Sequence, residues 1–281
     1  MCQLSLEALK IRLAALLFLG VLWPGCTSSK TNEANQDRRA KVPVVVAVGG
    51  SAHRWTVPSS EERNPTPSED FLFFLWVKLS RTPTDSVRAI AAMKFDETSP
   101  DRQGFAIALS RSGGGIRPEV YWKDASARGG WYPFPEVGVS PHRWTLLTLS
   151  YRSGKFLGLH SLVRDDEGGQ KVSELGGHLV SAPPPQSTKP IIIGSATSTS
   201  SFRGKIGPVG IISGRGLAEH ISDILAAIDR NPGLAPPVPD GLRLNMFISR
   251  REHERSTDPE KTGHGANQGV PLFSPIPTHA R

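Results

Sequence analysis

Short apolar stretches with a period of two fill the middle of the chain, and they constrain its fold more than any other feature. In the stretch 71–79, every second residue is apolar and large: Phe71, Phe73, Leu75, Val77 and Leu79. Successive side chains of a β-strand point to opposite faces, so these side chains are expected to share one face. Further strands are predicted at 44–48, 89–95, 104–110, 116–122, 144–151, 156–163, 171–175, 190–194 and 202–212. Many short strands at close spacing predict a β-sandwich or a barrel.

Glycine and proline are frequent enough to form the many turns of such a fold. The chain has 28 Gly and 24 Pro in 281 residues. Both residue types interrupt helices, so the composition argues against a helical bundle. The segments 112–115 (Ser-Gly-Gly-Gly) and 152–155 (Arg-Ser-Gly-Lys) predict hairpin turns. Since all-β domains often contain about 200 residues, one sandwich accounts for the chain without a second domain.

One segment after the predicted strands has the pattern of a helix. Its apolar residues recur at the spacing i, i+3, i+4 and i+7 and form a single stripe. The stripe consists of Ile221, Ile224, Leu225 and Ile228. The segment 231–233 (Asn-Pro-Gly) is expected to end the helix. Residues 231–281 are rich in Pro, Gly, His and charge, which predicts a largely disordered tail in which residues 242–248 could add an edge strand.

The first residues have the order of an export signal. Lys10 and Arg12 precede the apolar run 13–23, and a polar stretch follows it. The run is too short to cross a hydrocarbon layer of about 30 Å as a helix, so a removable signal is favoured over an anchor helix. We therefore predict a signal peptide at residues 1–25 and a flexible polar tether at residues 26–42.

Cys26 is the candidate lipidation site. It directly follows Gly25, and a small residue before a cysteine at the end of such a signal resembles the bacterial lipobox. That resemblance implies cleavage before Cys26, diacylation of its thiol and a membrane-anchored lipoprotein of the bacterial cell envelope. Thr27 follows the cysteine in place of the Asp that retains such proteins at the inner membrane of enteric bacteria, so the outer membrane or cell surface is the expected destination. Cys2 lies inside the predicted signal peptide, so the mature chain would have no disulfide. The alternative is an ordinary secretory signal with an incidental cysteine.

Three motifs in fixed order resemble the laminin-G-like branch of the concanavalin A-like jelly rolls. They are the Trp-led strand and hairpin at 142–155, the strand at 190–194, and the Phe-x-Gly-x-Ile strand at 202–211, which the predicted helix follows. With the early strand at 69–78, the resemblance covers residues 43–230. It implies an all-β protein: an antiparallel two-sheet β-sandwich with one short C-terminal helix and disordered termini.

The same resemblance implies a candidate calcium site. Many laminin-G-like domains bind calcium through loop oxygens, and Asp165, Asp166 and Glu167 offer such hard ligands in one loop. A solvated acidic turn is the alternative. Zinc is not indicated, because the histidines are isolated and acylated Cys26 would provide no thiolate. No other cofactor is predicted.

The acidic residues do not have the arrangement of a glycan-cleaving site. Retaining glycosidases hold two carboxylates about 5 Å apart. Enzymes of this fold commonly present them as alternating acids on one strand, whereas this chain has no Glu-x-Asp-x-Glu segment. A Gly-x-Ser-x-Gly nucleophile elbow is absent as well. We therefore expect a non-catalytic protein, and a glycoside hydrolase is the less favoured alternative.

A group of aromatic and polar residues between 121 and 132 is the candidate ligand-binding site. Exposed aromatic rings stack on the apolar face of a sugar, and polar neighbours hydrogen-bond its hydroxyls. The aromatic candidates are Tyr121, Trp122, Trp131 and Tyr132, and the polar candidates are Lys123, Asp124 and Arg128. The alternative is that these aromatic residues are core residues or cross-strand pairs.

The charge pattern argues against a nucleic-acid partner. The formal net charge is +7, but Lys and Arg are scattered among Asp and Glu along the whole chain. We predict an exported, lipid-anchored envelope protein that presents its sandwich to a glycan or a protein ligand. The alternative is a structural or assembly component of an envelope complex that docks through its Pro-rich tail.

Overall fold

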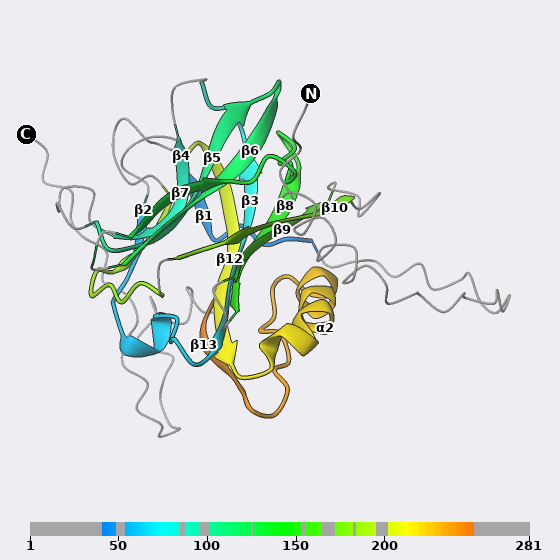
Figure 1. Cartoon of the computed structure of the whole chain (residues 1–281). Helices are drawn as coiled ribbons and strands as arrows, with labels where there is room; N and C mark the ends of the chain where they lie inside the picture. The colour runs from blue at the N-terminus through cyan, green and yellow to red at the C-terminus, as the bar shows by residue number, and fades with distance from the viewer. Residues whose placement is uncertain are drawn as a thin grey trace, which may run out of the picture. The chain divides into compact units, whose positions relative to one another are not determined.

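The body of the protein consists of two antiparallel sheets (Figure 1). The computed structural model describes residues 41–48, 54–84, 88–95, 102–124, 126, 128–152, 156–164, 172–181, 184–194 and 202–249. One sheet contains β1 (Val46–Val48), β3 (Asp70–Leu79), β8 (Trp144–Arg152), β9 (Phe156–Arg164), β10 (Val172–Leu179), β12 (Gly204–Gly214) and β13 (Leu242–Ile248). The other contains β2 (Arg54–Val57), β4 (Ala89–Lys94), β5 (Gly104–Ser112), β6 (Gly115–Lys123), β7 (Gly129–Pro133) and β11 (Ile191–Gly194).

The order of the strands mixes segments that are far apart in the sequence. The seven-stranded sheet has the order β1-β12-β3-β8-β9-β10, with β13 also paired to β12, and the six-stranded sheet has the order β2-β11-β4-β5-β6-β7. A short 3₁₀ helix, η1 (Glu61–Arg63), follows β2, and the helix α2 (Leu217–Arg230) follows β12. The predicted antiparallel two-sheet sandwich with one helix after it is therefore confirmed.

The main core lies between the two sheets. The alternation predicted for β3 is confirmed, since Phe71, Phe73 and Leu75 are fully buried in one cluster with residues of β5. The ring of Phe105 in β5 meets the rings of Phe71 and Phe73 edge-on, at centroid distances of 5.8 and 5.6 Å. Because these rings come from opposite sheets, they join the two layers.

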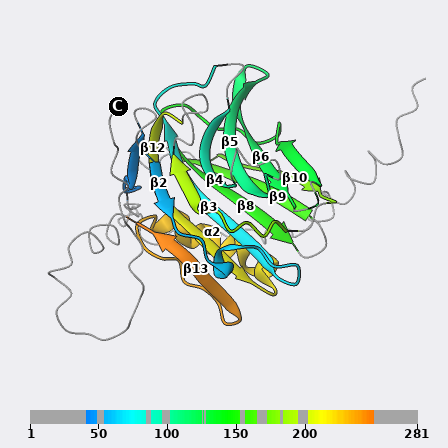
Figure 2. The same cartoon turned by 90° about the vertical axis from the view of Figure 1, so that its left-hand side faces the viewer.

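Helix α2 covers the outer face of the seven-stranded sheet. Leu72, Phe74 and Trp76, on the second face of β3, form a buried cluster with the apolar stripe of the helix. Figure 2 shows α2 behind the strands of this sheet. Strand β3 is thus buried on both faces, which explains why its sequence is apolar almost without interruption.

Two polar contacts hold α2 near its ends. Asp70 of β3 accepts a hydrogen bond at Oδ2 from the backbone N–H of Ala218, at 3.4 Å. Near the other end, Arg164 of β9 donates from Nη1 to the backbone oxygen of Asp229 at 3.0 Å. The side chains of Arg164 and Asp229 are each only 3% exposed. Since both partners of the helix lie on strands of one sheet, its position on that sheet is fixed.

The sandwich includes residues outside the predicted range 43–230. Val42, placed in the tether by the sequence, is buried in the cluster beneath α2. Strand β13, allowed as an addition within the tail, pairs with β12 and buries Met246 and Ile248 in the main core. Strands β2 and β7 were not expected, since each has only a few residues and β7 begins with two glycines.

Several predictions concern residues outside the described ranges. The signal peptide, Cys26 and the loop with Asp165, Asp166 and Glu167 all belong to this group. Among the residues that are described, no helix has both the length and the apolar character needed to cross a membrane.

Candidate aromatic binding face

The outer face of the six-stranded sheet has an apolar cluster of its own. The buried members are Ile90, Met93, Phe95, Ala106, Ala108 and Tyr121, and the partly buried ones are Trp131 and Ile192. All described members come from β4, β5, β6, β7 and β11 or from the residue after β4. In contrast to the other sheet, the cluster on this face includes no described helix residue. We call this surface the aromatic face.

Three aromatic rings form a row across the aromatic face. The ring centroid of Tyr121 lies 4.6 Å from that of Phe95 and 5.2 Å from that of Trp131. Tyr121 and Trp131 are cross-strand partners on β6 and β7, which places their side chains on the same face. Tyr121 is only 5% exposed, whereas Trp131 is partly exposed. The indole of Trp131 is therefore the accessible end of the row.

Arg88 lies over the ring of this indole, and Glu119 pairs with Arg88. The guanidinium carbon of Arg88 lies 4.6 Å from the ring centroid of Trp131. The same guanidinium donates from Nε to Oε2 of Glu119 at 2.7 Å. Glu119 shares a strand face with Tyr121, two residues away on β6. A cation thus covers part of the partly exposed ring, a carboxylate is paired with that cation, and both groups can hydrogen-bond a hydroxyl group.

Burial raises the pKa of Tyr121 above its usual value, and the nearby Arg102 has a smaller effect in the opposite direction. The phenol therefore remains protonated at neutral pH. The Tyr121 ring therefore adds no negative charge to the aromatic face. The negative charge next to Arg88 comes from the carboxylate of Glu119.

Trp122 corrects the sequence-based hypothesis. Its side chain is fully buried in the main core, and its ring stacks on Tyr151 of the other sheet at 5.3 Å with an interplanar angle of 19°. Neighbours in a strand point to opposite faces, so Tyr121 and Trp122 cannot contribute to one surface. The alternative of an aromatic core residue applies to Trp122, which is not available to a ligand.

Asp124 and Arg128 bind each other across the connection between β6 and β7. The carboxylate of Asp124 accepts hydrogen bonds from the backbone N–H and the Nε of Arg128, both at 2.8 Å. Asp124 is 4% exposed, so its oxygens are engaged in the turn and hidden from solvent. The structure therefore gives Asp124 and Arg128 a role in holding this turn rather than a place on the aromatic face.

The remaining candidates are divided between two places. Lys123 lies two residues after Tyr121 on β6 and is partly exposed, so it extends the aromatic face. Tyr132 packs instead against the main core, with its ring 5.6 Å from that of His178 on β10. Sequence reasoning found Tyr121, Lys123 and Trp131, and it missed Phe95, Arg88 and Glu119, which approach the face from other strands.

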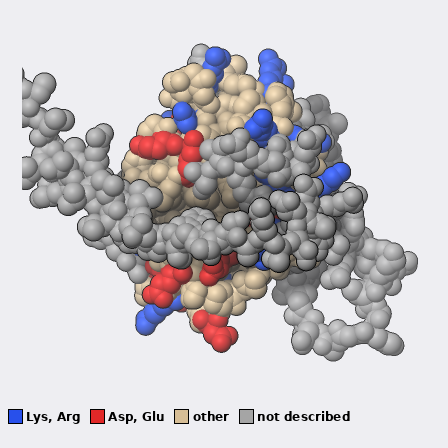
Figure 3. All heavy atoms as spheres, turned by 90° about the vertical axis from the view of Figure 1, so that its right-hand side faces the viewer, with Lys and Arg blue, Asp and Glu red and all other residues tan. Residues whose placement is uncertain are grey.

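The described residues show a mixed surface charge and no group of metal ligands. Both basic and acidic side chains occur on the face drawn in Figure 3, in agreement with the mixed charge of the sequence. Within the described ranges, no three His, Cys, Asp or Glu side chains are grouped so that they could hold a metal ion. The predicted calcium ligands lie outside those ranges.

Comparison with known proteins gives no family by sequence. No family model matches the chain, and no curated protein matches it. Among solved structures, it is similar to the enzymatically active domain of tailspike protein 2 from bacteriophage CBA120, with 11% identity and a TM-score of 0.47 over 74% of this chain and 32% of that one. The chain therefore spans about a third of that protein.

Two further similar structures are a neurotoxin binding domain and a pair of laminin domains. One is the binding domain of botulinum neurotoxin serotype G, with 11% identity and a TM-score of 0.40 over 59% of this chain and 37% of that one. The other is the LG4-5 pair of the mouse laminin alpha1 chain, with 16% identity and a TM-score of 0.30 over 62% of this chain and 41% of that one. Likenesses this distant do not indicate what the chain binds.

Proposed function

We propose that the protein is a laminin-G-like module that binds a glycan on its aromatic face, with the sugar ring stacked on Trp131. The observation that carries this proposal is the partly exposed indole at the end of the aromatic row, with the Arg88 guanidinium over part of its ring and Glu119 paired with that guanidinium. The sugar is proposed to stack on the part of the ring that Arg88 leaves open. An apolar ring face and adjacent hydrogen-bonding groups match the two faces of a sugar, which has C–H groups on one side and hydroxyls around its rim.

The packing of the face supports binding at low entropic cost. The Trp131 ring packs against the ring of Tyr121, and the Arg88 guanidinium lies over it. These two contacts hold the Trp131 side chain in place. A ring that is already fixed loses little rotamer freedom when a ligand binds, so more of the contact energy appears as affinity. The aromatic face is proposed to bind and not to cleave, because its carboxylate, Glu119, is paired with Arg88.

A glycan array probed with the full chain tests the proposal. We expect the wild-type chain to bind at least one class of glycan on the array. The variant Trp131→Ala should bind that glycan about tenfold or more weakly, because stacking contributes on the order of 1–2 kcal/mol. Phe247→Ala is the matched control: it removes a partly buried aromatic residue from the other sheet. Equal loss in both variants, or no retained glycan, would contradict the proposal.

The lipid anchor is a separate part of the proposal, and it is supported by the sequence around Cys26 alone. We infer that acylated Cys26 tethers the module to a bacterial membrane, so that the sandwich faces the envelope. Mass spectrometry of the mature chain, produced in a bacterium with its own N-terminal segment, is expected to show a diacylated N-terminal Cys26. An unmodified Cys26, or a mature chain that starts at another residue, would refute the anchor.

A further inference from the structure

A buried lysine lies beneath an exposed serine at one end of the six-stranded sheet. Lys94, the last residue of β4, is fully buried, and its register partner is the core residue Phe105. Its Nζ donates to Oγ of Ser59 at 3.0 Å and to the backbone oxygen of Lys189 at 2.8 Å. Ser59 follows β2 and is exposed. A serine on the surface is thus in direct contact with the amine of a buried lysine.

The position of the amine is suited to accepting a proton from Ser59. The carbonyl of Lys189 takes one N–H of the amine and thereby orients it. When Lys94 is neutral, its lone pair can accept the hydroxyl proton of Ser59 along the same 3.0 Å contact. This arrangement of nucleophile, base and orienting acceptor is the one that activated serines require.

The surroundings favour the neutral amine. Burial and, to a smaller extent, the positive charge of Arg63 lower the pKa of Lys94 to about 8. Arg63 donates from Nη1 to the backbone oxygen of Pro58, and its Nε is buried without a hydrogen-bond partner. One guanidinium, one amine that burial favours in its neutral form and one hydroxyl therefore lie close together at this site.

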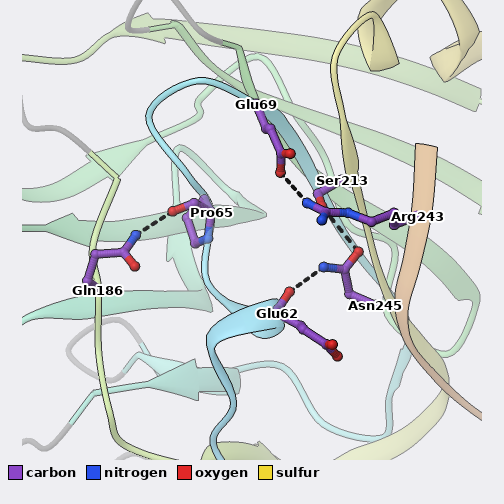
Figure 4. Close-up of polar contacts among 7 residues, drawn as sticks. All are labelled: Glu62, Pro65, Glu69, Gln186, Ser213, Arg243 and Asn245. Carbon is purple, nitrogen blue, oxygen red and sulfur yellow. Dashed lines mark hydrogen bonds and ion pairs between the residues drawn. The ribbon is translucent and has the colours of Figure 1, made fainter. Parts of the chain in front are cut away.

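The segment that carries Ser59 and Arg63 is anchored on both sides (Figure 4). Asn245 of β13 donates to the backbone oxygen of Glu62, and Gln186 donates to that of Pro65. In addition, Nη2 of Arg243 lies 2.6 Å from Oε2 of Glu69. These contacts fix the connection between β2 and β3, so the serine and the arginine do not depend on a loose loop for their positions.

We propose that Ser59 and Lys94 form a nucleophile and general base that transfer acyl groups from carboxylic esters to water. This activity is separate from glycan binding and does not rest on the aromatic face. Esters are the proposed substrates because their alcohol leaving group needs only the single proton that Lys94 has taken up.

The proposed reaction has two balanced steps. Oγ of Ser59 bonds to the ester carbonyl carbon while its proton passes to Nζ of Lys94, and the ester C–O bond then breaks as that proton moves to the departing alcohol. A water molecule next attacks the acyl group on Ser59, with Lys94 again taking and returning one proton. The products are one alcohol and one carboxylic acid, and Ser59 and Lys94 are regenerated.

Labelling of the full chain with an alkyl fluorophosphonate tests the pair, with the modified residue located by peptide mass spectrometry. We expect Ser59 to be labelled, at a rate that rises with pH and levels off above about pH 8, where Lys94 is neutral. Hydrolysis of p-nitrophenyl acetate should follow the same profile. Ser59→Ala should abolish the labelling and the hydrolysis, whereas Ser60→Ala, which alters the neighbouring hydroxyl, should retain both.

Lys94 is tested by Lys94→Met and by Lys94→Arg, which keeps the charge and the hydrogen-bond donors but cannot act as a base. Either variant should slow labelling of Ser59 about 100-fold or more. Circular dichroism identifies a variant that fails to fold, and the conclusion then rests on the other variant and on the pH profile. The proposal is overturned if Ser59 is not labelled, or if its labelling rate is the same without Lys94 and independent of pH.

Discussion

The variant Trp122→Ala is expected to lower the free energy of unfolding by about 3–5 kcal/mol, the largest effect that we expect from a single substitution in this protein. The indole of Trp122 is fully buried between the sheets, stacked on Tyr151 and close to Phe105. Its removal leaves a cavity bordered by strands of both sheets, which the strand pairing prevents from collapsing. Urea unfolding followed by circular dichroism measures this loss.

Trp131→Ala is the matched comparison for Trp122→Ala. Both residues are tryptophans on neighbouring strands, but Trp131 is partly exposed on the aromatic face. We expect the Trp131→Ala variant to lose only about 1 kcal/mol of the free energy of unfolding, because folding buries less apolar area of the Trp131 side chain than of the Trp122 side chain. A similar loss in the two variants would contradict the assignment of Trp122 to the core and of Trp131 to the surface.

The second large effect concerns the pH dependence of stability at Lys94. In the folded chain the pKa of Lys94 is about 8, below the usual lysine value of 10.5 that applies when the chain is unfolded. Between these two pH values the unfolded chain binds the proton more strongly, so the free energy of unfolding rises as the pH increases. The shift corresponds to about 3 kcal/mol in total.

Lys94→Met isolates this contribution, since methionine keeps much of the side-chain volume and cannot titrate. Urea unfolding of wild type and variant from pH 7 to pH 11 should show a stability difference that changes by about 3 kcal/mol across the range, in favour of the wild type at high pH. Other groups that titrate between pH 7 and pH 11 contribute equally to the free energy of unfolding of the wild type and of the variant. A difference that is constant with pH would show that Lys94 titrates normally.

The sequence predicts those elements whose signal is local. The alternation of residues 71–79 identified β3 and its core face, and the spacing of Ile224, Leu225 and Ile228 identified the buried side of α2. Both patterns repeat within a few residues and follow directly from strand and helix geometry. Strand β2 is too short for such a pattern, and the two glycines of β7 provide no side chains to form one.

The candidate site was predicted only in part, because its remaining residues meet through sheet order. Alternation along β6 requires Tyr121 and Trp122 to face opposite ways, but it does not say which one faces the core. That choice depends on Tyr151 and Phe105, which pack against Trp122. Arg88 reaches Trp131 across the strands β4, β5 and β6, an order that the sequence does not show.

The contact between Ser59 and Lys94 was missed for the same reason. The two residues are 35 positions apart, and neither lies in a motif associated with an activated serine. They meet because β11 pairs with β2 on one side and with β4 on the other. The sequence argues against a serine nucleophile because the chain has no Gly-x-Ser-x-Gly elbow. That motif marks the nucleophile in only one family of folds.

The proposed position of the sugar is on Trp131 of the six-stranded sheet. The most direct measurement is a crystal structure of the chain with the oligosaccharide that the glycan array identifies. We expect the electron density to show a sugar ring over the indole of Trp131, with its hydroxyls within hydrogen-bond distance of Arg88 or Glu119. A sugar bound on the seven-stranded sheet, or at loops away from β6 and β7, would contradict binding at Trp131.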